Sequence, residues 1–251
     1  MESLLVRLFG FRALLLHGDP LVLDRWRWLR PRLAGPSQRL LDVGCGNGSF
    51  TIGAALLNHN ALGLTWDERD RSLATERASL VGANSARFET QDVRVLDERA
   101  DLTDGFDTVI CLENIEHIVD DERLMRSMGA TLAPGGRLLL TTPNADYRPI
   151  DRTHAGPFLP IEDGRHVRKG YTFEQLRELC ESAGLDVRET SSCSGFFSQK
   201  VAGVMWKLQQ RTHLGAWLVV LPLRALPLLD PLVRRLGWPD YSVCVVAVKP
   251  G

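Results

Sequence analysis

The sequence predicts an α/β protein with a doubly wound, mostly parallel sheet of seven strands. Three observations lead to this prediction. Short apolar runs alternate with helical stretches over residues 39–143, a glycine-rich turn (GCGNG) follows the first run directly, and the run FDTVICL at 106–112 is apolar almost throughout. Such a run is typical of a strand that is covered on both faces, and strands that alternate with helices form the βαβ units of parallel sheets.

The elements follow from periodicity and from helix signals. The expected strands, in chain order, are 39–43, 61–66, 86–92, 106–112, 137–143, 186–193 and 241–248. Helices are expected over 49–60, 67–83 and 120–132, and the turn LAPGG separates the last of these from the fifth strand. A further helix begins with Thr172, which precedes Gln175 in a capping-box pattern, and ends at Gly184.

Four segments describe the expected organisation. Residues 1–38 form a helical lid, with an amphipathic helix at 1–19, and residues 39–193 form the α/β core. Residues 194–240 are an apolar helical insert, and 241–251 return to the core as its last strand. Within the core, 144–169 forms a long loop on the acceptor side, and loops of this length in compact domains are usually functional or disordered.

Composition excludes several classes of partner. The chain of 251 residues has a formal net charge of −1 and no basic stripe, so we expect no nucleic-acid partner. Its five cysteines stand far apart without metal-ligand spacing, which indicates reduced thiols in a cytoplasmic protein and no metal site. The longest apolar stretch, LGAWLVVLPL at 214–223, is shorter than the roughly 20 residues that cross a bilayer, so we expect no membrane span.

The glycine turn predicts a ligand that lies very close to the backbone. Glycine permits positive φ and close approach, and the helix that follows presents its N-terminus to the ligand. In the dinucleotide fingerprint G-x-G-x-x-G the third glycine comes one residue later than Gly48 does here. Asp42 would also repel a pyrophosphate, whereas it could accept a hydrogen bond from a cationic amine, so the pattern argues against NAD.

Four motifs together resemble class I S-adenosylmethionine-dependent methyltransferases, in particular the ubiquinone-biosynthesis-like branch. They are DVGCGNG at 42–48, the pair Asp92-Val93, FDTVICLENIEHI at 106–118 and LAPGGRLLLTTPN at 132–144. The resemblance covers residues 40–145. It implies a Rossmann-like methyltransferase fold and S-adenosylmethionine as cofactor.

The resemblance also implies a set of cofactor-binding residues. They are Asp42, Gly44, Gly46, Asn47, Gly48, Thr65, Trp66, Asp67, Asp70, Asp92, Val93, Glu113 and Asn114. Thr65 stands where the family usually has the acidic residue that holds the ribose. The run G-L-T is similar to the cyclopropane-fatty-acid-synthase branch, so Asp70, or else Asp67, is expected to hold the ribose. Trp66 and the pair Asp92-Val93 are expected at the adenine, and Glu113 with Asn114 at the methionine end.

Three histidines are candidates for a general base. His117 follows the fourth strand, and His154 and His166 lie in the loop at 144–169. An imidazole suits proton transfer near neutral pH. The alternative is that Glu116-His117 only shapes the entry to the next helix and supports the cofactor pocket. Arg165 and Arg168 of the same loop could bind an acidic acceptor, or else form surface ion pairs in a solvated loop.

The acceptor is expected to be a small or lipid-like molecule that is methylated on a hydroxyl or carboxyl oxygen in a biosynthetic reaction. Methyl or methylene transfer to a carbon of a lipid is the alternative within this class, and an NAD-dependent oxidoreductase is the alternative outside it. The apolar insert is interpreted as part of a lid. Burial of its surface would equally account for a homodimer or a peripheral membrane contact.

Overall fold

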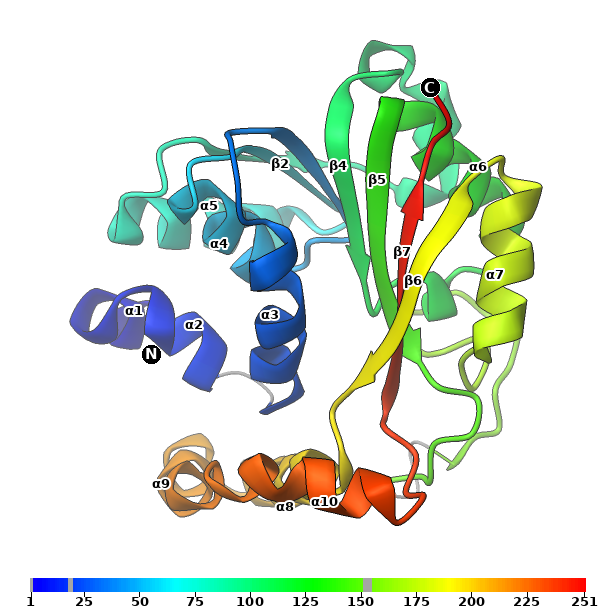
Figure 1. The fold of residues 1–251 in the computed structure, drawn as a ribbon. Coiled ribbons are helices and arrows are strands. Elements are labelled where there is room, and N and C mark those ends of the chain that lie inside the picture. The colour runs from blue at the N-terminus through cyan, green and yellow to red at the C-terminus, as the bar shows by residue number, and fades with distance from the viewer. Residues whose placement is uncertain (1, 18–19, 151–154) are drawn as a thin grey trace.

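The computed structural model describes residues 2–17, 20–150 and 155–251, and it confirms the predicted fold class. In this part of the chain, seven strands form one sheet in the order β3-β2-β1-β4-β5-β7-β6 (Figure 1). Strand β7 is antiparallel to both of its neighbours, and all other pairs are parallel. The strands are β1 (Arg39–Val43), β2 (Asn60–Thr65), β3 (Ala86–Thr90), β4 (Phe106–Leu112), β5 (Leu132–Pro143), β6 (Asp186–Cys193) and β7 (Ser242–Val248).

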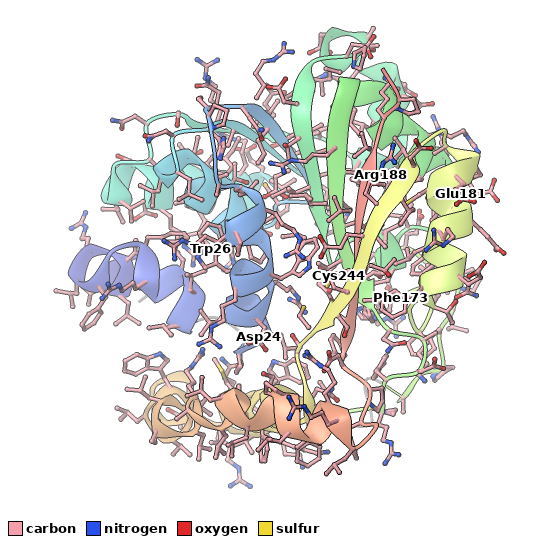
Figure 2. The ribbon with its side chains drawn as sticks, in the orientation of Figure 1. Asp24, Trp26, Phe173, Glu181, Arg188 and Cys244 are labelled. Atoms are coloured by element: carbon pink, nitrogen blue, oxygen red, sulfur yellow. The ribbon has the colours of Figure 1, made fainter. Side chains whose placement is uncertain are left out.

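Helices cover both faces of this sheet. In chain order the helices are α1 (Glu2–Phe9), α2 (Phe11–His17), α3 (Pro20–Arg32), α4 (Ser49–Leu56), α5 (Glu68–Val81), α6 (Asp121–Thr131), α7 (Phe173–Ser182), α8 (Phe196–Gln209), α9 (His213–Leu223) and α10 (Asp230–Arg235). The last three lie at an edge of the sheet rather than on a face (Figure 1). Figure 2 shows Trp26 of α3 among the N-terminal helices on one side, and Phe173 and Glu181 of α7 on the other side.

Two buried cores explain the apolar run of the central strand. Val109 of β4 belongs to the core that includes α6 and α7, whereas the next residue, Ile110, belongs to the core that includes Trp26 of α3 and Ile52 of α4. Successive side chains of a strand point to opposite faces, so both must be apolar when helices cover both faces.

Four elements differ clearly from expectation, each for a local reason. The expected helix at 49–60 ends at Leu56, because Asn58 has a φ of 69° and β2 begins at Asn60. The expected helix at 1–19 is two helices, because Gly10 between them has a φ of 62°. The expected turn LAPGG is part of β5, since Leu132 pairs with Phe106 of β4 and the Gly135 N–H donates to the Lys249 carbonyl at 3.0 Å. Strand β3 ends at Thr90, earlier than expected, because Asp92 caps a short 3₁₀ helix, η1 (Val93–Glu98).

Helices α8 to α10 lie at the edge of the sheet where the parallel strands end. Strand β6 runs in the direction of β5, because both are antiparallel to β7, so its last residue lies at the carboxyl edge. The segment from α8 to α10 leaves β6 there and returns to β7 at the same edge (Figure 1). Ligands of open α/β sheets bind at this edge, so the fold places the helical insert beside the expected site.

Candidate active site

The turn after β1 lies against the chain that follows β4. Gly44, Gly46 and Gly48 have φ values of 83°, 49° and 83°, which only glycine adopts readily. A Cβ on Gly44 would collide with the side chain of Asn114, and a Cβ on Gly48 would lie 2.7 Å from Cβ of Ala74. Two of the glycines are therefore required by close packing as well as by the backbone conformation.

A cavity of about 230 Å³ opens beside this turn, at the carboxyl ends of the parallel strands. Residues from the turn, from the ends of β2 and β4 and from η1 line it. The expected residues among them are Gly44, Gly46, Thr65, Trp66, Asp70, Asp92, Val93, Glu113, Asn114 and His117. Sequence motifs far apart in the chain thus converge on one cavity.

The lining of the cavity fits a cofactor that is cationic at one end and carries an aromatic base. Trp66 is 70% exposed and precedes α5, and Asp70 lies in the first turn of that helix. A flat ring stacks favourably on an exposed indole, and a carboxylate accepts hydrogen bonds from vicinal hydroxyls. Glu113 and Asp92 supply two more carboxylates at this cavity.

Four of the expected cofactor residues are not among those that line the cavity: Asp42, Asn47, Gly48 and Asp67. Asp67 caps α5, where its carboxylate accepts from the Arg69 N–H at 2.8 Å, so of the two ribose candidates Asp70 alone faces the cavity. Asp42 is buried beneath the turn and accepts from Thr51 Oγ1 at 2.6 Å. Burial raises the pKa of Asp42 to about 7.

Glu113 is held by groups from three distant parts of the chain. Its backbone has a φ of 54°, which is uncommon outside glycine. One carboxylate oxygen accepts from Thr141 Oγ1 at 3.0 Å and from Ser242 Oγ at 2.8 Å, and the other forms an ion pair with Arg25 at 3.1 Å. These partners belong to β5, β7 and α3, so helix α3 is coupled directly to a residue of the cavity.

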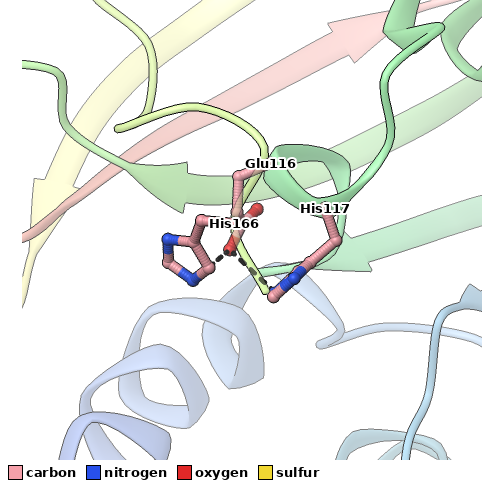
Figure 3. A group of neighbouring side chains, drawn as sticks. All are labelled: Glu116, His117 and His166. Atoms are coloured by element: carbon pink, nitrogen blue, oxygen red, sulfur yellow. Dashed lines mark ion pairs between the residues drawn. The ribbon is translucent and has the colours of Figure 1, made fainter. Parts of the chain in front are cut away.

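Glu116, His117 and His166 form a cluster next to this cavity (Figure 3). Oε1 of Glu116 lies 3.9 Å from Nε2 of His117 and 4.0 Å from Nε2 of His166, and the two rings meet edge to face with centroids 4.6 Å apart. Glu116 is completely buried; its Oε2 accepts from Thr142 Oγ1 at 3.0 Å. Burial raises the pKa of Glu116 to about 8 and lowers the pKa of His117.

The loop after β5 delivers His166 to the cluster. The Val167 N–H donates to the Glu116 carbonyl at 3.0 Å, and the Arg168 guanidinium donates to the carbonyls of Ile118 and Val119 at 2.8 and 2.9 Å. Arg168, which the sequence suggests for binding an acidic acceptor, is thus engaged in fixing the loop. His154 lies outside the described residues.

Four residues that line the cavity are not among those expected from the sequence: Arg94, Ile118, Glu162 and Gly164. Arg94 forms an ion pair with Glu162 at 2.9 Å and donates to Asp92, which lowers the pKa of that carboxyl. Glu162 also accepts from the Val119 N–H at 2.7 Å. The loop therefore closes over the cavity through side chains that match no motif.

The cluster has a donor set that some transition-metal sites use, namely one carboxylate and two imidazoles. Its ligand atoms lie within 4.8 Å of one another. Ligand atoms of a tetrahedral zinc site are about 3.3 Å apart, given bonds of about 2.0 Å to nitrogen and oxygen, so metal binding would require the side chains to move inward. The sequence-based expectation that the protein has no metal site stays a prediction.

Comparison with known proteins assigns the family. A family model described as a methyltransferase domain matches residues 20–190. The chain belongs to this family and is an S-adenosylmethionine-dependent methyltransferase, which excludes the alternative of an NAD-dependent oxidoreductase.

Individual relatives are distant. The ubiquinone biosynthesis O-methyltransferase of Coxiella burnetii (strain Dugway 5J108-111) is 28% identical over 167 residues, which are 64% of this chain and 69% of that protein. Two solved structures share the fold: phosphoethanolamine N-methyltransferase 2 of Haemonchus contortus with S-adenosyl-L-methionine, and magnesium protoporphyrin IX methyltransferase of Synechocystis PCC 6803 with bound SAH. The first has a TM-score of 0.66 at 18% identity and covers 96% of this chain and 57% of that chain. The second has a TM-score of 0.59 at 19% identity and covers 99% and 100%.

Proposed function

We propose that this enzyme transfers a methyl group to an oxygen atom, most simply a hydroxyl, of a small or lipid-like acceptor. The observation that carries the proposal is the imidazole of His117 at the cavity, with the His166 ring against it. Methylation of a hydroxyl releases a proton, and a positioned base speeds such a step by about 10²–10⁴-fold. The relative from Coxiella burnetii is an O-methyltransferase, which supports the same class of reaction.

The cofactor, when bound, supplies a methyl group on a sulfonium; the new O–CH₃ bond forms as the CH₃–S bond breaks, and S-adenosylhomocysteine leaves. The chain supplies the rest. One imidazole of the pair takes the hydroxyl proton, and it can do so at neutral pH because burial lowers the pKa of His117 and keeps the ring uncharged. The loop that carries His166 contributes Glu162 and Gly164 to the wall of the cavity.

Buried Glu116 acts as a positioning residue in this proposal. Its Oε1 faces both imidazoles and has no hydrogen-bond partner among the described residues. When one ring takes up the hydroxyl proton, the imidazolium favours the ionised form of Glu116, whose own proton passes to solvent, and the two opposite charges stabilise each other. In this proposal, Oε1 of Glu116 has an ionic partner only while one of the two imidazoles is protonated.

The experiment is a turnover assay that measures release of S-adenosylhomocysteine with phenols, alcohols and carboxylic acids as acceptors. His117→Asn and His166→Asn are compared with Arg126→Ala, an exposed change on α6 away from the cluster. Loss of turnover in at least one histidine variant, with unchanged cofactor affinity, supports the proposal. Full turnover in the double histidine variant, or methylation of carboxylic acids only, would contradict the imidazole base.

Methyl transfer to carbon is a second candidate that one observation favours. Thr65, the residue that makes the second strand similar to the cyclopropane-fatty-acid-synthase branch, lines the cavity. The two candidates differ in the product: an O-methyl group and a C-methyl group have distinct carbon chemical shifts, so NMR of the product formed with ¹³C-methyl cofactor separates them.

A further inference from the structure

The helical insert exposes a large apolar surface, here called the insert surface. It is formed by leucine and valine side chains of α9, of a 3₁₀ turn (Leu226–Leu229) and of α10 and the residue that follows it. Leu228 is 70% exposed and Leu236 is 85% exposed. Its members are Leu218, Val219, Leu221, Leu226, Leu228, Leu229, Leu232 and Leu236. Exposed apolar residues gathered on one segment usually mark a site of contact.

The shape of this segment favours lying along a membrane over crossing one. The stretch Gly215–Arg235 is long and apolar enough for a span, with a mean hydropathy of 1.6 over a window of which only 17% is buried. In the structure it is divided into α9, the 3₁₀ turn and α10, and Figure 1 shows α9 end-on while α10 runs across the view. Both helices pack on α8. A segment that is broken into short helices and held on α8 suits the lipid–water boundary better than a span, which needs about 20 consecutive residues in one helix.

Charge indicates the kind of membrane. Over residues 196–237 the basic residues are Lys200, Lys207, Arg211, Arg224, Arg234 and Arg235. Asp230 is the single acidic residue in this range, and it is buried, where it accepts from the backbone N–H groups of Phe197 and Ser198. Asp240, the other acidic residue of the insert at 194–240, forms an ion pair with Arg234 at 2.8 Å, so the insert still has an excess of basic residues in a chain whose net charge is −1. Basic residues beside exposed apolar side chains complement anionic headgroups.

A groove continues the apolar character toward the N-terminal helices. It has a volume of about 250 Å³ and lies between α1, α2 and α9, with Phe9, Trp217 and Leu221 among its lining. Leu4, Leu8 and Phe9 of α1 are themselves 56%, 65% and 58% exposed. The family model ends at residue 190, so the whole insert lies outside the part of the chain that the family model matches.

We propose that the insert surface binds the surface of an anionic lipid bilayer and holds the carboxyl edge of the sheet at the lipid–water boundary. The insert and the cofactor cavity share that edge, so an acceptor dissolved in the bilayer would reach the cavity without crossing bulk water. The binding itself does not depend on the oxygen acceptor proposed above, because it is measured without methyl transfer.

The test is co-sedimentation of the full chain with vesicles of phosphatidylcholine, and with vesicles of phosphatidylcholine mixed with phosphatidylglycerol. Wild-type protein is expected to bind the anionic vesicles and to lose binding as salt is raised. Leu228→Ser/Leu232→Ser and Arg211→Glu/Arg235→Glu are each expected to weaken binding by about tenfold or more, because each removes one of the two attractions.

A matched control changes charge by the same amount elsewhere. Arg87→Glu/Arg126→Glu alters exposed residues of β3 and α6 and is expected to keep most of the binding. Circular dichroism and thermal unfolding of each variant establish that it folds. Wild-type protein that binds neither vesicle at low salt, or a leucine variant that binds as wild type does, overturns the proposal. So does a dimer, detected by analytical ultracentrifugation, that the leucine changes dissociate while vesicle binding is absent.

Discussion

Gly44→Ala tests whether the turn after β1 requires glycine for the reason that the structure gives. A residue with a Cβ in the left-handed region costs about 1–2 kcal/mol, and Gly44 has a φ of 83°. The added Cβ would also meet the side chain of Asn114, and overpacking of this kind costs about 1–3 kcal/mol. The variant should therefore lose about 2–5 kcal/mol of unfolding free energy and bind S-adenosylmethionine more weakly, since Asn114 lines the cavity.

Glycines that have a positive φ but open space at the Cβ position separate the conformational cost from the cost of the contact with Asn114. Gly82 and Gly46 have φ values of 71° and 49°, and a Cβ on either would meet no atom within 4 Å. Gly82→Ala should therefore show the conformational cost alone, at the C-terminus of α5, and leave cofactor affinity unchanged. Urea unfolding gives the free energies, and calorimetric titration gives the affinities. If Gly44→Ala were no more destabilised than Gly82→Ala, the contact with Asn114 would not be the reason for the glycine.

Three further predictions concern the site. Asp70→Asn should lower the affinity for S-adenosylmethionine by about 10-fold or more, through loss of a charged hydrogen bond. Asp67→Asn should leave that affinity unchanged and cost at most about 1 kcal/mol of unfolding free energy, because it only weakens a helix cap. Equal effects of the two changes on the affinity measured by calorimetry would contradict the assignment of Asp70. In a pH–rate profile, turnover should rise with pH on an acid limb whose midpoint lies below the ordinary imidazole pKa, because burial lowers the pKa of His117 and the base acts only when unprotonated. His117→Asn should abolish this acid limb. If the limb persists in the variant, it belongs to another group. Prolonged dialysis against a chelator should leave turnover unchanged, and a loss that zinc restores would show that Glu116, His117 and His166 hold a metal.

The core of the fold could be predicted because its signals are local. Each of these signals predicts the conformation of a few neighbouring residues. They are Gly48 at the start of α4, the capping box of Thr172 and Gln175, and the run of β4 that is apolar on both faces. The expected boundaries failed where a distant partner decides them. Strand β5 begins as early as Leu132 because Leu132 pairs with Phe106, and no sequence pattern near LAPGG indicates this pairing.

The residues of the site also fall into two groups, those that local motifs predict and those that only the tertiary fold brings together. The residues of the cavity that belong to motifs were found, whereas the ion pair of Arg25 with Glu113 and the approach of His166 to Glu116 depend on the tertiary fold. Arg25 lies on α3, which carries no motif, and His166 is placed by the hydrogen bond between Val167 and Glu116. Asp67 and Asp70 could not be separated from the sequence, because both suit the first turn of a helix.

The central claim is that the turn at 44–48 and the cavity beside it bind S-adenosylmethionine. Calorimetric titration of the purified chain with S-adenosylmethionine, S-adenosylhomocysteine and NAD tests it most directly. The structure and the family predict saturable binding of the first two at one site per chain and no binding of NAD. Binding of NAD alone, or binding of the first two that Gly44→Ala and Asp70→Asn leave unchanged, would contradict the assignment of this cavity.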